Sequence, residues 1–279
     1  MKEISTKRIV SRKGRDMSLF WQEYKMNVKS MVIWALCVGG ICVGCLLLYG
    51  SLEDSVSEMA DVFANMGAFS EALGMDKVNI GTLEGYYAVE ISILFSLGGA
   101  VYSAMLGAGL VAKEEEGKTY EFLNALPLSR GKILAEKFGA FVGLSFTFHG
   151  ICVCLVLLGF AWMGSMPHME SFAKYHGAAF FMCLEIGTVC FLLSVICRKR
   201  PISAAVGIAM FLYMMDICSK VVPALDKLKY FTPFSYSNAA DIFSGGNTDV
   251  WLREIGVGAA VFGIALCASF VVYQKKDLM

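Results

Sequence analysis

The chain has 279 residues, of which 57% are hydrophobic and 17% charged, with a mean hydropathy of +0.60 and a formal net charge of zero. Soluble domains carry about 45–50% apolar and about 25% charged residues, so this composition excludes an ordinary soluble domain. It indicates a membrane protein.

Six apolar runs are long enough to cross a bilayer, because a helix needs about 20 apolar residues to span a hydrocarbon core of about 30 Å. We therefore expect an all-α polytopic membrane protein. Residues 1–30 should form a cytoplasmic basic tail and an interfacial amphipathic helix, and residues 31–279 a six-helix transmembrane domain. The expected spans are 31–52, 86–112, 139–164, 178–197, 203–225 and 252–273.

Basic residues are distributed unevenly around these spans. Eighteen of the 24 Lys and Arg residues lie on the side of the N-terminus, and six lie on the other side or at the helix ends there. Cytoplasmic loops carry the excess of Lys and Arg, so both termini and the polar stretch 113–138 are expected in the cytoplasm. The protein is expected in the plasma membrane of a bacterium.

The segment before the first span predicts an amphipathic helix over residues 16–31. Residues 1–15 are basic and contain no apolar core, so no cleaved signal peptide is expected. A helix that runs straight into a span is expected to lie in the cytoplasmic interface and to turn into the membrane, although a cytosolic helix packed on a partner fits as well. Its apolar positions are Met17, Phe20, Trp21, Tyr24, Val28 and Met31.

The central polar stretch contains Gly117-Lys118-Thr119, which matches only the end of a phosphate-binding loop. The complete motif needs a glycine where this chain has Ala112, and a preceding strand where it has an apolar helix. No catalytic residue and no ATPase site of its own are therefore expected. As structure, the stretch predicts a short helix over 119–126, stopped by Pro127, and a new helix capped by Ser129. On this reasoning alone, an ordinary solvated loop fits equally well.

The residues of this stretch also resemble a known signature. Glu116 to Leu123, followed by Leu126 to Arg130, is similar to the signature of the ABC type-2 permease family, and Tyr230 to Phe234 resembles a second family feature. The resemblance implies an elbow helix before the first span, and a coupling helix between the second and third spans that sits in a cleft of a separate ATP-binding subunit. The coupling residues it implies are Glu116, Gly117, Thr119, Tyr120, Glu121, Leu123, Pro127, Ser129 and Arg130.

The resemblance further implies an ATP-driven exporter. Two copies of an ABC ATP-binding subunit would hold ATP and Mg, while this chain would bind no cofactor. A second permease copy, or a related permease, would complete a shared path in the lipid bilayer, and no nucleic-acid partner is implied. The cargo is not identified by the sequence; a peptide, an antibiotic and a lipid-like molecule are the candidate classes.

Four ionisable residues lie at membrane depth in the expected spans. Such groups are costly there and usually face a cavity or one another. The acidic ones are expected to line an outer-leaflet cavity that favours cationic cargo. Two simpler interpretations remain open. Asp216 and Lys220 could form an i, i+4 ion pair, and His149 could be a packing residue. The four residues are Glu90, His149, Glu185 and Asp216.

All ten cysteines lie in apolar runs, so neither a disulfide framework nor a metal site is expected. Two other functions remain as alternatives. An ion- or proton-driven secondary transporter would use Glu185 and Asp216 and need no ATPase. A non-transporting immunity or sensor subunit would bind a peptide through its outer loops.

Overall fold

The computed structural model describes residues 19–120 and 128–276, and this part of the chain is helical and without strands. Six of its helices are long and apolar enough to cross a membrane, which confirms the predicted number of spans. They are α1 (Leu19–Ala64), the run Leu83–Leu110, α7 (Arg130–Trp162), α8 (Met169–Ile196), α9 (Ile202–Val221) and α12 (Thr248–Lys275). The run Leu83–Leu110 consists of α3 (Leu83–Tyr86), η1 (Tyr87–Ile91) and α4 (Ser92–Leu110).

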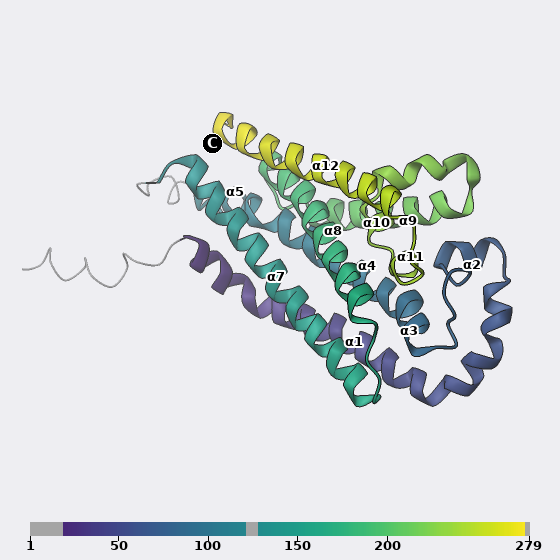
Figure 1. The fold of residues 1–279 in the computed structure, drawn as a ribbon. Coiled ribbons are helices and arrows are strands. Elements are labelled where there is room, and N and C mark those ends of the chain that lie inside the picture. The colour runs from purple at the N-terminus through teal and green to yellow at the C-terminus, as the bar shows by residue number, and fades with distance from the viewer. Residues whose placement is uncertain (1–18, 121–127, 277–279) are drawn as a thin grey trace, which may run out of the picture.

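Helix α1 is longer than its predicted span at both ends. Measured along its curved axis, the helix of 46 residues is about 69 Å long at 1.5 Å per residue, which is more than a bilayer core requires. The helix has no break at Met31, where a turn into the membrane was predicted. Its start packs on α7, with the Tyr24 hydroxyl 2.8 Å from Thr147 Oγ1. Its end curls toward α2 (Ala68–Leu73) (Figure 1).

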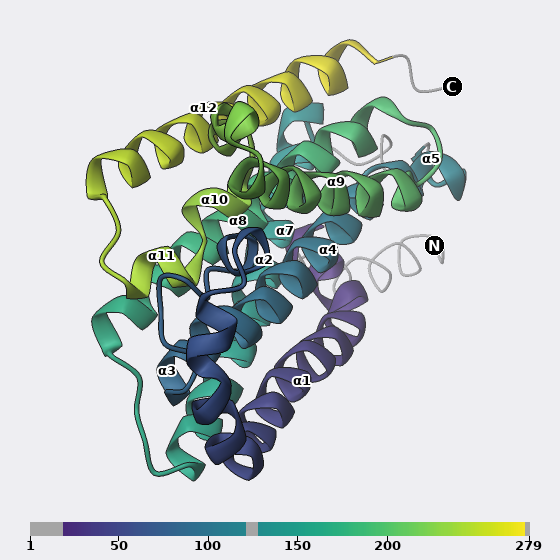
Figure 2. The same ribbon diagram turned by 90° about the vertical axis from the view of Figure 1, so that its right-hand side faces the viewer.

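The remaining long helices pack around α4 and α8, the two most buried spans. Helix α1 lies along α7, α9 along α4, and α12 along α8, so that α1 and α12 flank opposite sides of the bundle (Figures 1 and 2). Helix α4 approaches α8 closely at Gly107, because a Cβ on that residue would lie 2.2 Å from the carbonyl oxygen of Gly187 in α8. Gly40 and Gly44 of α1 face open space, with no atom of the described chain within 4 Å of a Cβ at either position.

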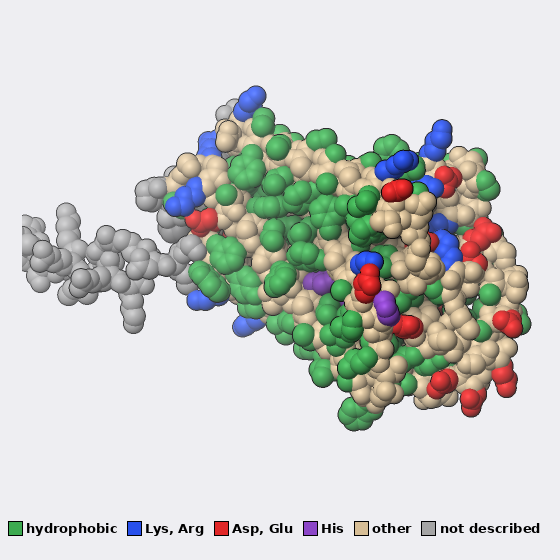
Figure 3. Space-filling view, in the orientation of Figure 1, with side chains coloured by type: hydrophobic (Ala, Val, Ile, Leu, Met, Phe, Trp, Pro, Cys, Tyr) green, Lys and Arg blue, Asp and Glu red, His purple; other side chains and the backbone are tan. Residues whose placement is uncertain are grey.

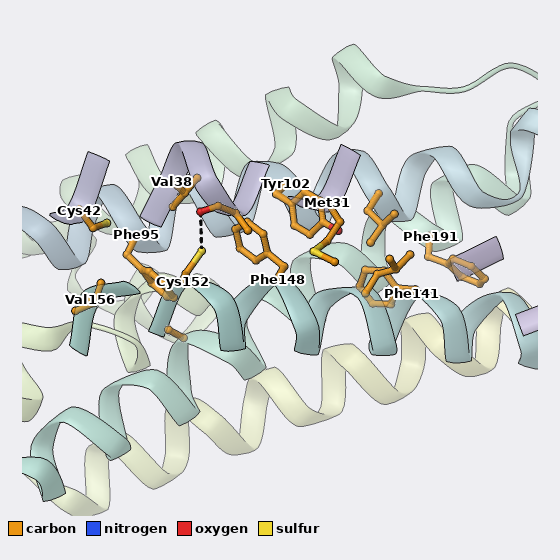
Figure 4. Close-up of a cluster of buried hydrophobic side chains, with 14 of the residues drawn as sticks. Met31, Val38, Cys42, Phe95, Tyr102, Phe141, Phe148, Cys152, Val156 and Phe191 are labelled. Carbon is orange, nitrogen blue, oxygen red and sulfur yellow. Dashed lines mark hydrogen bonds between the residues drawn. The ribbon is translucent and has the colours of Figure 1, made fainter. Parts of the chain in front are cut away.

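Large apolar side chains fill the centre of the bundle, where α1, α4 and α7 meet (Figure 4). Phe95, Phe148 and Cys152 are almost inaccessible, and the Cys152 thiol donates a hydrogen bond of 3.5 Å to the carbonyl oxygen of Ala35. The ten cysteines all lie in the described residues and are free thiols.

The two ends of the bundle differ. Leu19 and Lys276 lie at one end, which we call the terminal end, and the short elements η2 (Pro223–Phe231), α10 (Pro233–Tyr236) and α11 (Ala239–Phe243) lie at the other, the far end (Figure 1). Thr232 donates a hydrogen bond of 2.9 Å to the carbonyl oxygen of Leu212, so the segment after α9 folds back onto that helix. Hydrophobic side chains cover the middle of the surface, and charged ones gather at both ends (Figure 3).

Candidate functional site

The polar stretch between the second and third spans forms a junction at the terminal end. Helix α5 (Ala112–Glu116) continues from α4, and Lys118 then reverses the backbone with a φ of +54°. Helix α7 begins at Arg130, where the Ser129 hydroxyl accepts a hydrogen bond of 3.3 Å from the Lys132 amide, which confirms the predicted cap. Residues 121–127 lie outside the described residues.

A buried group of charges holds this junction. Lys137 of α7 has no exposed surface, and its ammonium group donates to Glu23 Oε1 at 2.5 Å, Glu114 Oε1 at 2.9 Å and the carbonyl oxygen of Leu110 at 2.9 Å. Lys113 pairs with the other oxygen of Glu23. We call Glu23, Lys113, Glu114 and Lys137 the Lys137 cluster. It joins α1, α5 and α7 at one point.

The charges of this cluster compensate one another, as buried ions require. Burial alone raises the pKa of Glu114, but attraction to Lys137 and a hydrogen bond from Thr119 outweigh it. The pKa of this carboxyl therefore lies below its ordinary value, and Glu114 is ionised at neutral pH. The cluster therefore links three helices through buried salt bridges, an arrangement that we call an ionic joint.

A second contact ties the junction to the turn before α9. Arg200 donates to Glu116 Oε2 from its side-chain Nε at 2.9 Å and from its backbone amide at 3.0 Å. These hydrogen bonds hold the pKa of the exposed Glu116 carboxyl below its ordinary value. Within the basic turn Arg198-Lys199-Arg200, Arg200 therefore bonds within the chain. The pair sets the position of the turn and adds little stability.

The end of α12 forms the third contact. Lys276 forms a salt bridge with Glu115 of α5 and donates a hydrogen bond of 2.8 Å to the carbonyl oxygen of Val195 in α8. Arg130 donates to the carbonyl oxygens of Lys276 at 2.8 Å and Gln274 at 3.3 Å. The junction is thus bonded to every long helix or to a turn adjoining it.

The predicted coupling residues fall into two groups. Glu121, Leu123 and Pro127 lie outside the described residues. The others surround the gap, and Glu116, Ser129 and Arg130 make the contacts given above, while Thr119 bonds the Glu114 side chain. The described members are Glu116, Gly117, Thr119, Tyr120, Ser129 and Arg130.

Sequence reasoning missed three residues of this site. Glu23 was placed on the polar face of the first helix, yet it is 2% exposed. Lys276 was counted only among the basic residues on the side of the N-terminus. Lys137 was in addition part of the resemblance to the family signature, but no partner was expected for either lysine. One sequence signal was available, because Lys137 directly precedes the apolar run that begins at Phe138. A lysine at such a position can be buried, and a buried lysine requires a carboxylate partner.

The four residues expected at membrane depth do not converge on one cavity. Glu90 is exposed, and Glu185 is 5% exposed and accepts a hydrogen bond of 2.6 Å from the Tyr236 hydroxyl. His149 packs edge-on against Phe95, with ring centroids 4.9 Å apart. Asp216 pairs with Lys220 at 2.6 Å, as the i, i+4 reading predicted, and borders a small cavity of about 30 Å³.

A larger cavity of about 580 Å³ opens at the far end, between α2, η2, α11 and the start of α12. None of the four predicted residues lines it. The described residues contain no group of three or more His, Cys, Asp or Glu that could hold a metal ion.

The six helices that can span a membrane, with a polar junction between the second and third of them, define a polytopic membrane protein. The family model described as "ABC-2 family transporter protein" matches residues 17–278, and the chain belongs to this family. It is therefore a multi-pass membrane permease, of a family whose members generally pair with ATP-binding subunits. Comparison with curated proteins gives no match.

Proposed function

We propose that this chain is the membrane permease subunit of an ATP-driven exporter in the plasma membrane, with both termini in the cytoplasm. Two copies of a separate ATP-binding subunit, which hold ATP and Mg, bind the terminal end, and a second permease copy completes the path. One observation carries the proposal. The junction around residues 117–129 is bonded to every long helix or an adjoining turn, as a part that receives an external force must be.

The contacts define how a displacement spreads. Closure of the ATP-binding subunits pushes on the segment between α5 and α7. Through Lys137 and Glu23 the displacement reaches α7 and α1. Through Glu116 and Arg200 it reaches the start of α9, and through Glu115 and Lys276 the end of α12. Buried ionic joints transmit such a motion well because separating their charges is costly. The helices then move together and release cargo outward.

The test is co-purification of the ATP-binding subunit with the tagged chain. The double variant Glu121→Lys and Leu123→Glu reverses one charge and introduces another in the proposed docking segment. It should release the ATP-binding subunit and abolish ATP-dependent transport. Lys227→Glu, a charge reversal at the far end, serves as the control and should leave both unchanged. Full binding and transport by the double variant would contradict the proposal.

Membrane vesicles supplied with ATP but no ion gradient separate this function from a secondary transporter. ATP alone should drive transport by the wild-type complex. Transport that needs an ion gradient and persists without ATP would favour the secondary transporter.

A further inference from the structure

The far-end cavity has the size and composition of a ligand site. Its volume of about 580 Å³ lies within the range of about 300–1,000 Å³ typical of small-molecule sites. Its wall combines charged side chains with apolar ones, including Ile242, Val250 and Trp251. The junction at the terminal end contributes no residue to it, so it forms a separate site.

The basic residues of the wall are already neutralised. Each of its four lysines, all within the described chain, forms a salt bridge with an acidic side chain. The pairs are Lys77–Asp241 at 2.6 Å, Lys174–Glu170 at 2.7 Å, Lys220–Asp216 at 2.6 Å and Lys229–Asp226 at 2.8 Å. An anionic ligand would have to compete with these carboxylates. The cavity is therefore poorly suited to an anion.

The acidic residues of the wall are not all neutralised. Glu71, Asp76 and Glu254 line the cavity, and within the described residues no salt bridge joins any of them to a basic side chain. Glu71 and Asp76 are exposed, whereas Glu254 is only 7% exposed. A buried carboxylate without a cationic partner is costly unless something compensates it.

The surroundings of Glu254 supply only part of that compensation. Ser235 favours the charged form of the carboxylate, and Lys229, which attracts it through space, is bonded to Asp226. Trp251 lies one helical turn before Glu254, and its indole nitrogen donates a hydrogen bond of 2.8 Å to the carbonyl oxygen of Tyr236. That bond fixes the indole ring in the cavity wall, where a cation can pack on a flat aromatic surface.

We propose that the far-end cavity binds an organic amine, with its ammonium group against Glu254 and its apolar part on Trp251. Glu71 and Asp76 add negative potential at the entrance and attract the cation. The inference concerns the permease chain alone, and it holds whether or not an ATP-binding subunit is attached.

The test is a binding measurement on the full chain in lipid nanodiscs, by saturation-transfer NMR, with empty nanodiscs as the blank. The probe is 2-phenylethylamine, and 2-phenylethanol is its neutral match in size and shape. One charge-assisted hydrogen bond corresponds to roughly a tenfold change in affinity. The amine should therefore bind about tenfold more tightly than the alcohol.

The variant Glu254→Gln keeps the shape of the side chain and removes its charge. It should weaken amine binding about tenfold and leave alcohol binding unchanged. Glu58→Gln, which removes an exposed charge of α1 outside the cavity wall, should change neither. Equal binding of the amine to wild type and Glu254→Gln would overturn the proposal, and so would equal binding of amine and alcohol.

A second variant keeps the test decisive if Glu254→Gln does not fold, as judged by its melting temperature. Trp251→Leu retains the carboxylate and removes the aromatic surface. It should weaken amine binding about threefold or more through loss of the cation–π contact. Unchanged amine affinity in this variant would overturn the proposal as well.

Discussion

Replacing Lys137 by methionine should destabilise the folded protein by about 3–5 kcal/mol, because it leaves two carboxylates buried without their shared cation. The Lys137 side chain has no exposed surface, and those of Glu23 and Glu114 are 3% and 18% exposed. Methionine fills a similar volume, so the loss of charge dominates over the loss of packing. Glu23 keeps its bond to Lys113, which places the expected cost toward the lower end of the range.

The measurement is the free energy of unfolding in mixed detergent micelles, followed by circular dichroism. Lys174→Met is the control, since it breaks an exposed i, i+4 pair with Glu170 and should cost less than about 0.5 kcal/mol. Adding Glu23→Gln to Lys137→Met removes one unpaired charge and should restore part of the stability. If Lys137→Met cost no more than Lys174→Met, the buried cluster would not be the ionic joint described here.

Three further predictions concern single positions. The pKa of Glu114 lies below its ordinary value of 4.5, so the charged carboxylate stabilises the fold above pH 4.5 and this contribution is lost as the pH falls below that value. On acidification, the melting temperature of the wild type should therefore fall more than that of Glu114→Gln. Equal falls of the two melting temperatures would contradict this prediction. Lys118→Gly should raise the stability by up to about 1 kcal/mol, because glycine adopts a φ of +54° without strain; a lower melting temperature would count against it. Gly107→Ala should lower the free energy of unfolding by about 1–3 kcal/mol, because the new methyl group clashes with the Gly187 carbonyl. Gly109→Ala, with no atom within 4 Å of the new methyl group, should be neutral or stabilising. Equal effects of the two variants would refute the close approach of α4 and α8.

The membrane architecture could be predicted because it depends on local composition. Each span is a run of apolar residues, and the alternatives for such a run in a bilayer are few. The ends of the helices were predicted less accurately than their number. Helix α1 continues from Leu19 to Ala64 because no proline interrupts it and its outer part keeps helical periodicity, so hydrophobicity alone could not locate its ends.

The ionic joints could be predicted only where the partners are neighbours on one helix. Asp216 and Lys220 are four residues apart, and their pairing follows from helix geometry. Glu23 and Lys137 are separated by more than a hundred residues, and their contact depends on how α1 packs along α7. Spacing in the sequence carries no information on that packing. For the same reason Glu254 went unnoticed, since only the fold places it in a cavity wall.

The central claim is that the segment between α5 and α7 receives an ATP-binding subunit. Photo-crosslinking tests it directly, with p-benzoylphenylalanine in place of Tyr120 at the edge of that segment. Tyr230 of η2, a half-buried tyrosine at the far end, is the matched control position. We predict a crosslink from position 120 to a protein that mass spectrometry identifies as an ABC ATP-binding subunit, and none from position 230. No crosslink to such a subunit from position 120, or an equal one from position 230, would contradict the account.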